Sequence, residues 1–197
     1  MSKLSGTENL RILLDSIVPL PAEEWRLLEA TLRPCVFAKN EALIETGAHE
    51  AIIHFLRLGL VRYFYLTEDG TEHNHTFAGE ESLVGCFPVL AGAESCPFTV
   101  EALEPTHTLR IGPEVVRAFA SRHPCWNQLW IRLVEHVALR KAAREQSFLL
   151  DSVEQRYRRF LTDHADLAHR IPQYHIASWL GITPVALSRI RKRINHG

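Results

Sequence analysis

The 197-residue chain lacks several features that would assign it to other classes of protein. It has no run of about 18 apolar residues, the length that a transmembrane helix needs. Its four cysteines are scattered without Cys-x-x-Cys spacing, at Cys35, Cys86, Cys96 and Cys125. This argues against a zinc ribbon or a disulfide framework and favours reduced thiols. We therefore expect a cytoplasmic protein that makes no membrane contact.

Acidic residues are also absent from residues 169–197, although the whole chain carries 23 Asp and Glu against 22 Lys and Arg. Residues 151–197 contain eight basic and four acidic residues, a net charge of +4, and residues 1–150 contain 14 and 19, a net charge of −5. A polyanionic partner is therefore expected at the C-terminal end.

Within this basic region, residues 173–192 have the pattern of a helix-turn-helix. The inner face of the first helix is expected to be Ile176, Ala177 and Leu180. Gly181 follows, where the turn needs a residue that tolerates positive φ, and Thr183 and Pro184 suit the first positions of a second helix.

The second helix is predicted to bury one face and expose a basic one. Leu187, Ile190 and Ile194 recur at helical spacing, which leaves Val185, Arg189 and Lys192 on the opposite side. An apolar inner face backed by cations suits a helix that lies in the major groove of DNA.

The middle of the chain predicts an antiparallel roll of the jelly-roll type. Between residues 35 and 111, seven or eight short segments rich in β-branched and aromatic residues are separated by turn sequences. The clearest hairpin spans residues 60–77, with Asp69-Gly70 at its centre. Short helices are expected over 5–17, 22–32 and 114–122.

A long helix is predicted over about 125–150, and a further helix over 151–168. About 26 helical residues extend about 39 Å, too far to be buried on one small barrel. We therefore expect a homodimer whose interface includes Trp130, Leu133 and Val137. Packing of this helix across its own barrel is the alternative.

With a small β-roll, then a long helix, then a C-terminal helix-turn-helix, the chain resembles the Crp/Fnr family of bacterial transcription regulators in the order and size of its parts. The sequences that carry the resemblance are IASWLGITPVALSRIRKRI at 176–194 and FAGEESLVG at 77–85, which is similar to the family's phosphate-binding cassette. The resemblance implies an α+β fold in three parts: a cyclic-nucleotide-binding-like β-roll (1–123), a long dimerisation helix (124–150) and a small helix-turn-helix domain (151–197). It also implies a homodimer on double-stranded DNA, an effector in the roll, and contact with RNA polymerase.

The cassette departs from that of members that bind cyclic AMP. Those members carry an Arg-Ser/Thr-Ala triplet whose Arg grips the phosphate, and here Cys96, Pro97 and Phe98 stand in its place. We therefore expect no response to cyclic AMP, and no cofactor is predicted. The candidate effector pocket comprises Gly79, Glu80, Leu83, Cys96, Phe98 and Thr99.

Two other kinds of site are considered. His73, His75 and Glu80 resemble half of a cupin metal motif, so a metal-binding enzyme or metal sensor is the alternative function. Cys86 and Cys96 could form a thiol switch, although buried small hydrophobes are the commoner role of free cysteines. No catalytic motif is evident, and we expect a regulator rather than an enzyme.

The DNA contacts predicted from the sequence divide into two groups. Arg189 is expected to read a guanine edge, with Val185 and Ser188 beside it. Phosphates are expected to be held by Thr183, Lys192 and Arg193, next to Pro184, with Gln173 or His175 touching the backbone from the first helix.

Overall fold

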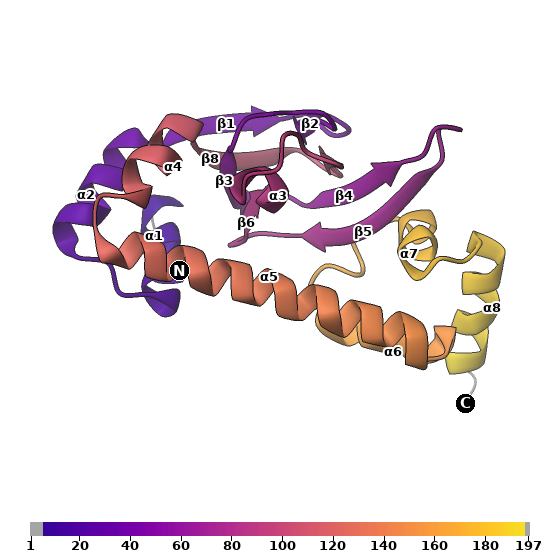
Figure 1. Cartoon of the computed structure of the whole chain (residues 1–197). Coiled ribbons are helices and arrows are strands. Elements are labelled where there is room, and N and C mark those ends of the chain that lie inside the picture. The colour runs from indigo at the N-terminus through magenta and orange to yellow at the C-terminus, as the bar shows by residue number, and fades with distance from the viewer. Residues whose placement is uncertain (1–5, 196–197) are drawn as a thin grey trace.

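The computed structural model describes residues 6–195 and has an eight-stranded antiparallel roll at its centre (Figure 1). The strands are β1 (Arg33–Phe37), β2 (Ala42–Ile44), β3 (Ile53–Leu58), β4 (Val61–Leu66), β5 (Glu72–Ala78), β6 (Leu83–Gly85), β7 (Thr99–Ala102) and β8 (Thr106–Ile111). They form two four-stranded sheets, with orders β1-β8-β3-β6 and β2-β7-β4-β5. The predicted α+β class and β-roll are confirmed. The short strand β6, within the cassette, was not predicted.

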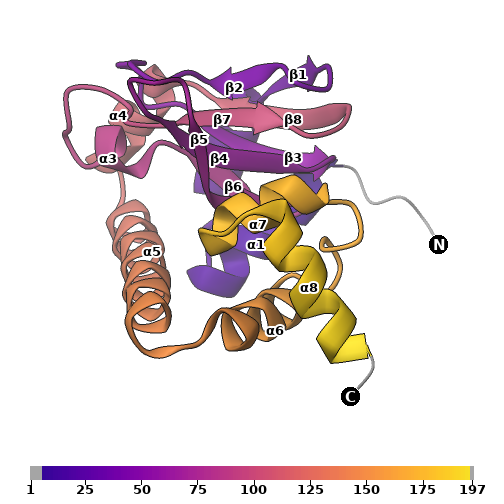
Figure 2. The same ribbon diagram turned by 90° about the vertical axis from the view of Figure 1, so that its right-hand side faces the viewer.

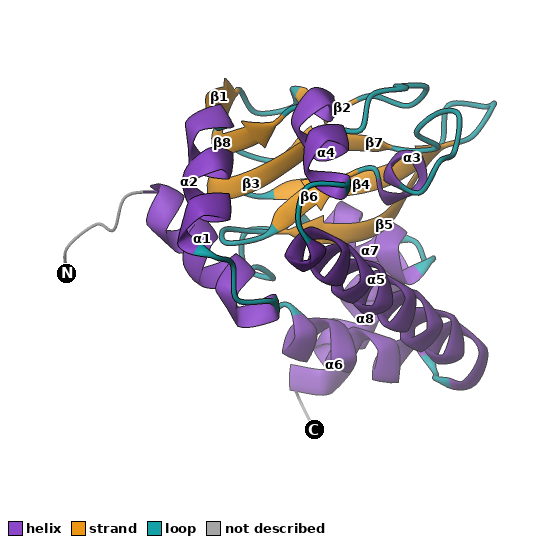
Figure 3. Ribbon diagram, turned by 60° about the vertical axis from the view of Figure 1, so that its left-hand side comes forward, coloured by secondary structure: helices purple, strands orange, loops and turns teal. Residues whose placement is uncertain are grey.

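The helices pack around this roll on several sides (Figure 3). They are α1 (Gly6–Ile17), α2 (Ala22–Thr31), α3 (Phe87–Leu90), α4 (Pro113–Ala120), α5 (Pro124–Leu150), α6 (Val153–Asp163), α7 (Gln173–Leu180) and α8 (Pro184–Asn195). The long helix has the expected bounds. Helix α6 ends five residues earlier than expected, because residues 164–170 form turns. In the described residues, no helix has the length and apolar character needed to cross a membrane.

The hairpin of β4 and β5 forms where Asp69-Gly70 predicts it. Gly70 has φ of 83° and the strands pair from Leu66 opposite Glu72 to Val61 opposite Ala78. One irregularity interrupts the ladder, since Tyr63 pairs with Thr76 and Phe64 with Asn74. His75 is therefore the extra residue of a bulge. The hairpin projects from the roll toward α7 (Figures 1 and 2).

One hydrophobic cluster joins the roll to the C-terminal helices. It contains Leu60, Phe77 and Leu103 of the roll together with Phe160 of α6 and Ile176 of α7, all 7 % exposed or less. Phe77 and Phe160 make an edge-to-face contact with centroids 6.0 Å apart. The C-terminal helices thus pack on one another and also bury part of their apolar surface on the roll, and the status of residues 151–197 as a separate domain stays a prediction.

We predict that Phe160→Ala lowers the stability of the roll and of the C-terminal helices together. Phe160 is fully buried in the shared cluster, so its truncation should cost about 3–5 kcal/mol. Leu161→Ala, at the neighbouring and 37 % exposed position, is the matched control and should cost under about 1 kcal/mol. Urea unfolding followed by tryptophan fluorescence and by circular dichroism should give coincident transitions. Separate transitions for roll and C-terminal helices in the parent chain would contradict a shared core.

Candidate nucleic-acid interface

Helices α7 and α8 are joined by the tight turn that the sequence predicts. Gly181 adopts φ of 72° and its N–H donates to the carbonyls of Ala177 and Ser178. Thr183 caps the next helix, since its Oγ1 accepts from the N–H of Ala186 at 3.2 Å. The expected roles of Gly181 and Thr183 in the turn are therefore confirmed.

The two faces of α8 differ as predicted. Leu187 and Ile190 are 1 % and 6 % exposed and belong to the shared cluster, whereas Val185 is 62 % exposed. The other expected contact residues of α8 are exposed as well, namely Pro184, Ser188, Arg189, Lys192 and Arg193. Among the described residues, no ion pair involves Arg189 or Arg193. A cationic helix face is thus presented to solvent, with α8 on the outer side of α7 (Figure 2).

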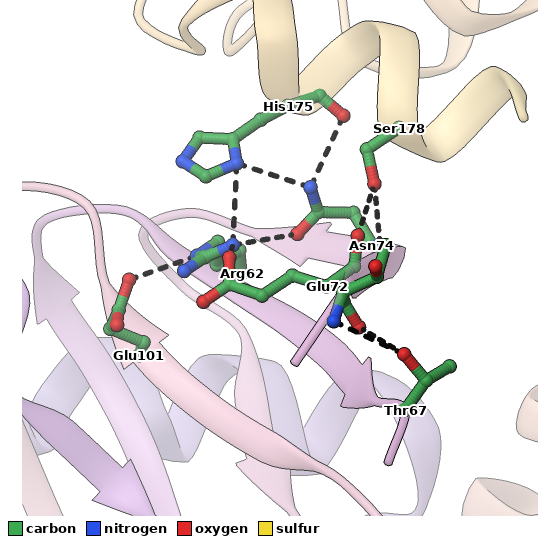
Figure 4. Close-up of polar contacts among 8 residues, drawn as sticks. Arg62, Thr67, Glu72, Asn74, Glu101, His175 and Ser178 are labelled. Atoms are coloured by element: carbon green, nitrogen blue, oxygen red, sulfur yellow. Dashed lines mark hydrogen bonds and ion pairs between the residues drawn. The ribbon is translucent and has the colours of Figure 1, made fainter. Parts of the chain in front are cut away.

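Helix α7 is docked on the β4–β5 hairpin by a buried polar cluster (Figure 4). At its centre, Arg62 is only 4 % exposed and binds Glu101 through Nε at 2.9 Å, and Glu72 through Nη1. Nδ1 of His175 faces both Arg62 Nη1 at 3.3 Å and Asn74 Nδ2 at 3.1 Å. Both partners are donors, so Nδ1 is the acceptor of a neutral imidazole.

The electrostatics of this cluster follow from its burial. Burial disfavours the charged form of Arg62, but the hydrogen bonds that Arg62 donates to Glu72 and Glu101 more than offset this effect, and the pKa of Arg62 is raised. Burial, and then the charge of Arg62, lower the pKa of His175 to about 4. His175 is 5 % exposed. The sequence predicts a DNA backbone contact for this residue, and the structure instead places it against the roll. Gln173, at the start of α7, is exposed.

A second contact joins the loop before α7 to the cassette. Arg170 pairs with Glu80 at 2.8 Å and also with Glu104. Glu80 additionally accepts from the N–H of Gly59 at 2.9 Å. The hydrogen bonds from Arg170 lower the pKa of Glu80 to about 2. Leu167 lies so close over Gly79 that a Cβ there would be 2.5 Å from its methyl carbon.

These contacts change the interpretation of the candidate effector pocket. A cavity of about 540 Å³ lies between the roll and α5, and of the six expected residues Leu83 and Phe98 line it. Gly79 and Glu80 instead face Leu167 and Arg170. Cys96 is buried beside Cys86 in the core of the roll, where burial first and Cys86 second raise its thiol pKa to about 12. Thr99 accepts a hydrogen bond from the N–H of Thr46 through Oγ1.

The residues expected at the dimer interface face the roll of their own chain. Trp130 stacks on Phe87 with centroids 6.1 Å apart, Leu133 packs against the core cluster of the α1–α5 end, and Val137 lines the cavity. This face of α5 therefore packs across the roll of its own chain, which is the alternative given in the sequence analysis. Another side of α5 is exposed and includes Ile131, Val134, Ala138, Ala142 and Leu149.

The alternative metal site is not favoured. Glu80 is held by Arg170, His73 is exposed at the hairpin, and His75 lies among Tyr63, Tyr65 and Phe98. Within residues 6–195, no group of three His, Cys, Asp or Glu side chains is placed to hold a metal ion.

Comparison with known proteins agrees with this architecture. Residues 34–123 match the family model of the cyclic nucleotide-binding domain. The structure of CLP, a c-di-GMP-responsive global regulator of Xanthomonas campestris, superposes with a TM-score of 0.72 at 12 % identity, over 89 % of this chain and 92 % of that one. The chain has the Crp/Fnr fold. The fold that the resemblance implies is thereby confirmed.

Other structures with this fold cover the chain to a similar extent. FixK2 of Bradyrhizobium japonicum has a TM-score of 0.71 at 18 % identity, over 84 % of this chain and 85 % of that one. The catabolite activator protein of Thermus thermophilus has a TM-score of 0.57 at 20 % identity, over 93 % and 87 %. By sequence alone, no curated protein matches the chain.

Sequence reasoning missed the residues that dock α7 on the roll. Arg62, Asn74 and Glu101 lie in strands, and from the sequence alone their polar side chains would be expected to face solvent. The available signal was that Arg62 interrupts an otherwise apolar strand, Val61–Leu66, because a charge there needs a partner.

We predict that acid weakens the docked arrangement through His175. Its folded-state pKa of about 4 lies below the unfolded value, so the neutral form stabilises the fold fully above about pH 6.5, and stability falls as the pH drops toward 4. At pH 5 the loss from this histidine should be about 2 kcal/mol. The cation would form beside Arg62 and also face Glu72 and Lys39.

His175→Asn keeps an acceptor near the position of Nδ1 but cannot be protonated. Urea unfolding at pH 7 and pH 5 should therefore show a smaller acid loss for His175→Asn than for the parent. The exposed His107→Asn should leave the acid loss unchanged. An equal acid loss in the parent and His175→Asn would refute the assignment.

Proposed function

We propose that the chain is a homodimeric, sequence-specific DNA-binding transcription regulator of the Crp/Fnr type, acting in the cytoplasm, and not an enzyme. RNA polymerase is its proposed further partner. The observation that carries the proposal is the exposed basic face of α8, in a helix-turn-helix whose buried face is formed by Leu187 and Ile190. A helix of this kind fits the major groove, and its cations suit phosphates and guanine edges.

Each exposed residue of α8 has a proposed role that follows from its chemistry. Arg189 lies mid-helix, where its guanidinium can pair with O6 and N7 of a guanine. Val185 favours contact with a thymine methyl, and Ser188 lies beside Arg189. Phosphates are assigned to Thr183, Lys192 and Arg193 near the helix ends, and to Gln173 on α7. His175 is omitted because it is buried in the docking cluster.

Two-fold-symmetric DNA requires a dimer, and α5 offers the surface for a second copy. Ile131, Val134, Ala138, Ala142 and Leu149 recur at spacings of three, four and seven residues on the face of α5 turned away from the roll. Ile131 is 54 % and Leu149 76 % exposed. The two alanines allow close approach of a second helix. We therefore propose this face as the dimer interface, in place of Trp130, Leu133 and Val137.

The DNA-reading role is tested by site selection with Arg189→Ala and Lys192→Ala. Loss of Arg189 should cost about 1–3 kcal/mol per half-site and relax preference at one base pair. Loss of Lys192 should weaken all sequences alike and reduce the salt slope by about one per lost phosphate contact. In-vitro selection on the parent, followed by titrations at several salt concentrations, measures both effects.

Arg158→Ala is the control, since this exposed arginine of α6 pairs with Glu154 within its own helix and is assigned no DNA contact. A changed base preference in Lys192→Ala with an unchanged one in Arg189→Ala would reverse the two roles. If selection enriches no sequence at all, the regulator proposal fails.

The dimer interface is tested by Val134→Asp. A charge in the middle of the proposed seam should cost several kcal/mol of association, so sedimentation should show a dimer for the parent and a monomer for the variant. Leu133→Asp, one residue away but packed on the own core, should instead lower thermal stability. Leu66→Asp, at an exposed apolar position of the hairpin, should change neither property. A monomeric parent at micromolar concentration would contradict the dimer.

A further inference from the structure

The cavity between the roll and α5 has two walls of different character. From the roll, it is lined by Tyr63, Leu83, Phe98 and other apolar or aromatic side chains. From α5, cations reach it. The volume of about 540 Å³ is in the range of small-molecule pockets.

Three of the cations of the α5 wall are not neutralised by the protein around them, in contrast to Arg132, which pairs with Glu135. Arg140, Lys141 and Arg144 line the cavity, and no ion pair within the described residues involves any of them. Arg140 donates to the hydroxyl of Thr76 at 3.2 Å. Among the described residues of the lining, Glu81 is the one that carries a carboxylate. The cavity is therefore electropositive, and the low-polarity opposite wall strengthens this field.

Within the part of the chain that the structure describes, two residues of the lining each have a buried nitrogen atom without a hydrogen-bond partner. These atoms are Nε2 of His75 and Nη1 of Arg144. Burying a polar group without a partner is unfavourable, and more so for a charged group. Burial, followed by Arg144 and Lys141, lowers the pKa of His75 to about 4. Burial, followed by Arg156, lowers that of Arg144 to about 10. An anion beside both groups would relieve these costs.

We propose that this cavity binds a small organic carboxylate with an aromatic or aliphatic body. The carboxylate is held by Arg144 and by His75, which takes up a proton or donates from Nε2, and the body lies against Tyr63, Leu83 and Phe98. A cyclic nucleotide fits less well, because Glu80 of the cassette is bound to Arg170 and position 96 is a cysteine instead of an arginine. The assignment of the ligand does not depend on the proposed DNA binding.

Arg144 also connects the cavity to the DNA-reading helices, so its regulatory consequence rests on the proposed function. Its Nη2 donates to the carbonyl of Trp179 in α7 at 3.0 Å, and its guanidinium lies 4.2 Å from the centre of the Trp179 ring. A carboxylate at Nη1 therefore acts on the same side chain that holds the end of α7. Ligand binding should change the docking of α7 and with it the affinity for DNA.

Calorimetry on the full chain tests the ligand class. Octanoate and 3-phenylpropionate are each titrated and compared with the corresponding alcohol. At least one carboxylate should bind about tenfold or more tightly than its alcohol, which corresponds to one charge-assisted hydrogen bond. Arg144→Gln should reduce the binding of the carboxylate about tenfold and leave that of the alcohol unchanged. Arg132→Gln is the matched control and should bind as the parent does, because Arg132 also lines the cavity but pairs with Glu135.

His75→Phe provides a second variant should Arg144→Gln fail to fold, since it keeps the aromatic packing and removes Nε2. This substitution too should weaken the binding of the carboxylate and leave that of the alcohol unchanged. The proposal is overturned if neither carboxylate binds up to about 10 mM, if the alcohols bind equally well, or if cyclic AMP binds more tightly than both. The calorimetry is carried out without DNA. If the ligand proposal fails, site selection with the parent chain therefore still tests the proposed regulator independently.

Discussion

The arrangement of this molecule depends on one buried cation, Arg62 of β4. Its guanidinium lies between two carboxylates of the roll and the imidazole of His175, and it is 4 % exposed. A buried charge is tolerated only with partners of this kind, and removal of one partner leaves an uncompensated group. The polar cluster also has directional requirements that apolar packing lacks. It therefore fixes where α7 sits on the hairpin, and α8 is positioned through α7.

The same docking gives the cassette an altered role. Glu80 belongs to the segment that resembles the family's cassette, and its carboxylate binds Arg170 from the loop before α7. Leu167 covers Gly79. The segment that would meet a nucleotide in cyclic-nucleotide-binding relatives is here an internal contact between roll and C-terminal helices. The positively charged surface of the cavity lies instead on α5, at Arg140, Lys141 and Arg144.

The parts of the structure that depend on local periodicity could be predicted from the sequence. Gly181, Thr183 and Leu187 identify the turn and buried face of the C-terminal helices, and Asp69-Gly70 identifies the hairpin. The phase of α5 could not be predicted, because apolar residues occur on two of its sides and only the position of the roll decides which is internal. Trp130 and Leu133 therefore looked equivalent to Ile131 and Val134. Long-range polar pairs such as Arg62 with His175, 113 residues apart, leave no periodic signal.

In the free protein, the polar cluster around Arg62 docks α7 on the roll. The backbone N–H of Asn74, in β5, donates across the interface to Oγ of Ser178 at 3.0 Å. Native-state hydrogen exchange at this amide therefore reports the docking directly. The amide of Asn74 should be protected from exchange about as strongly as the core amides of the roll, and Ser178→Ala should remove this protection selectively. Exchange of Asn74 at the rate of an exposed hairpin amide, while the core amides stay protected, would contradict this docking.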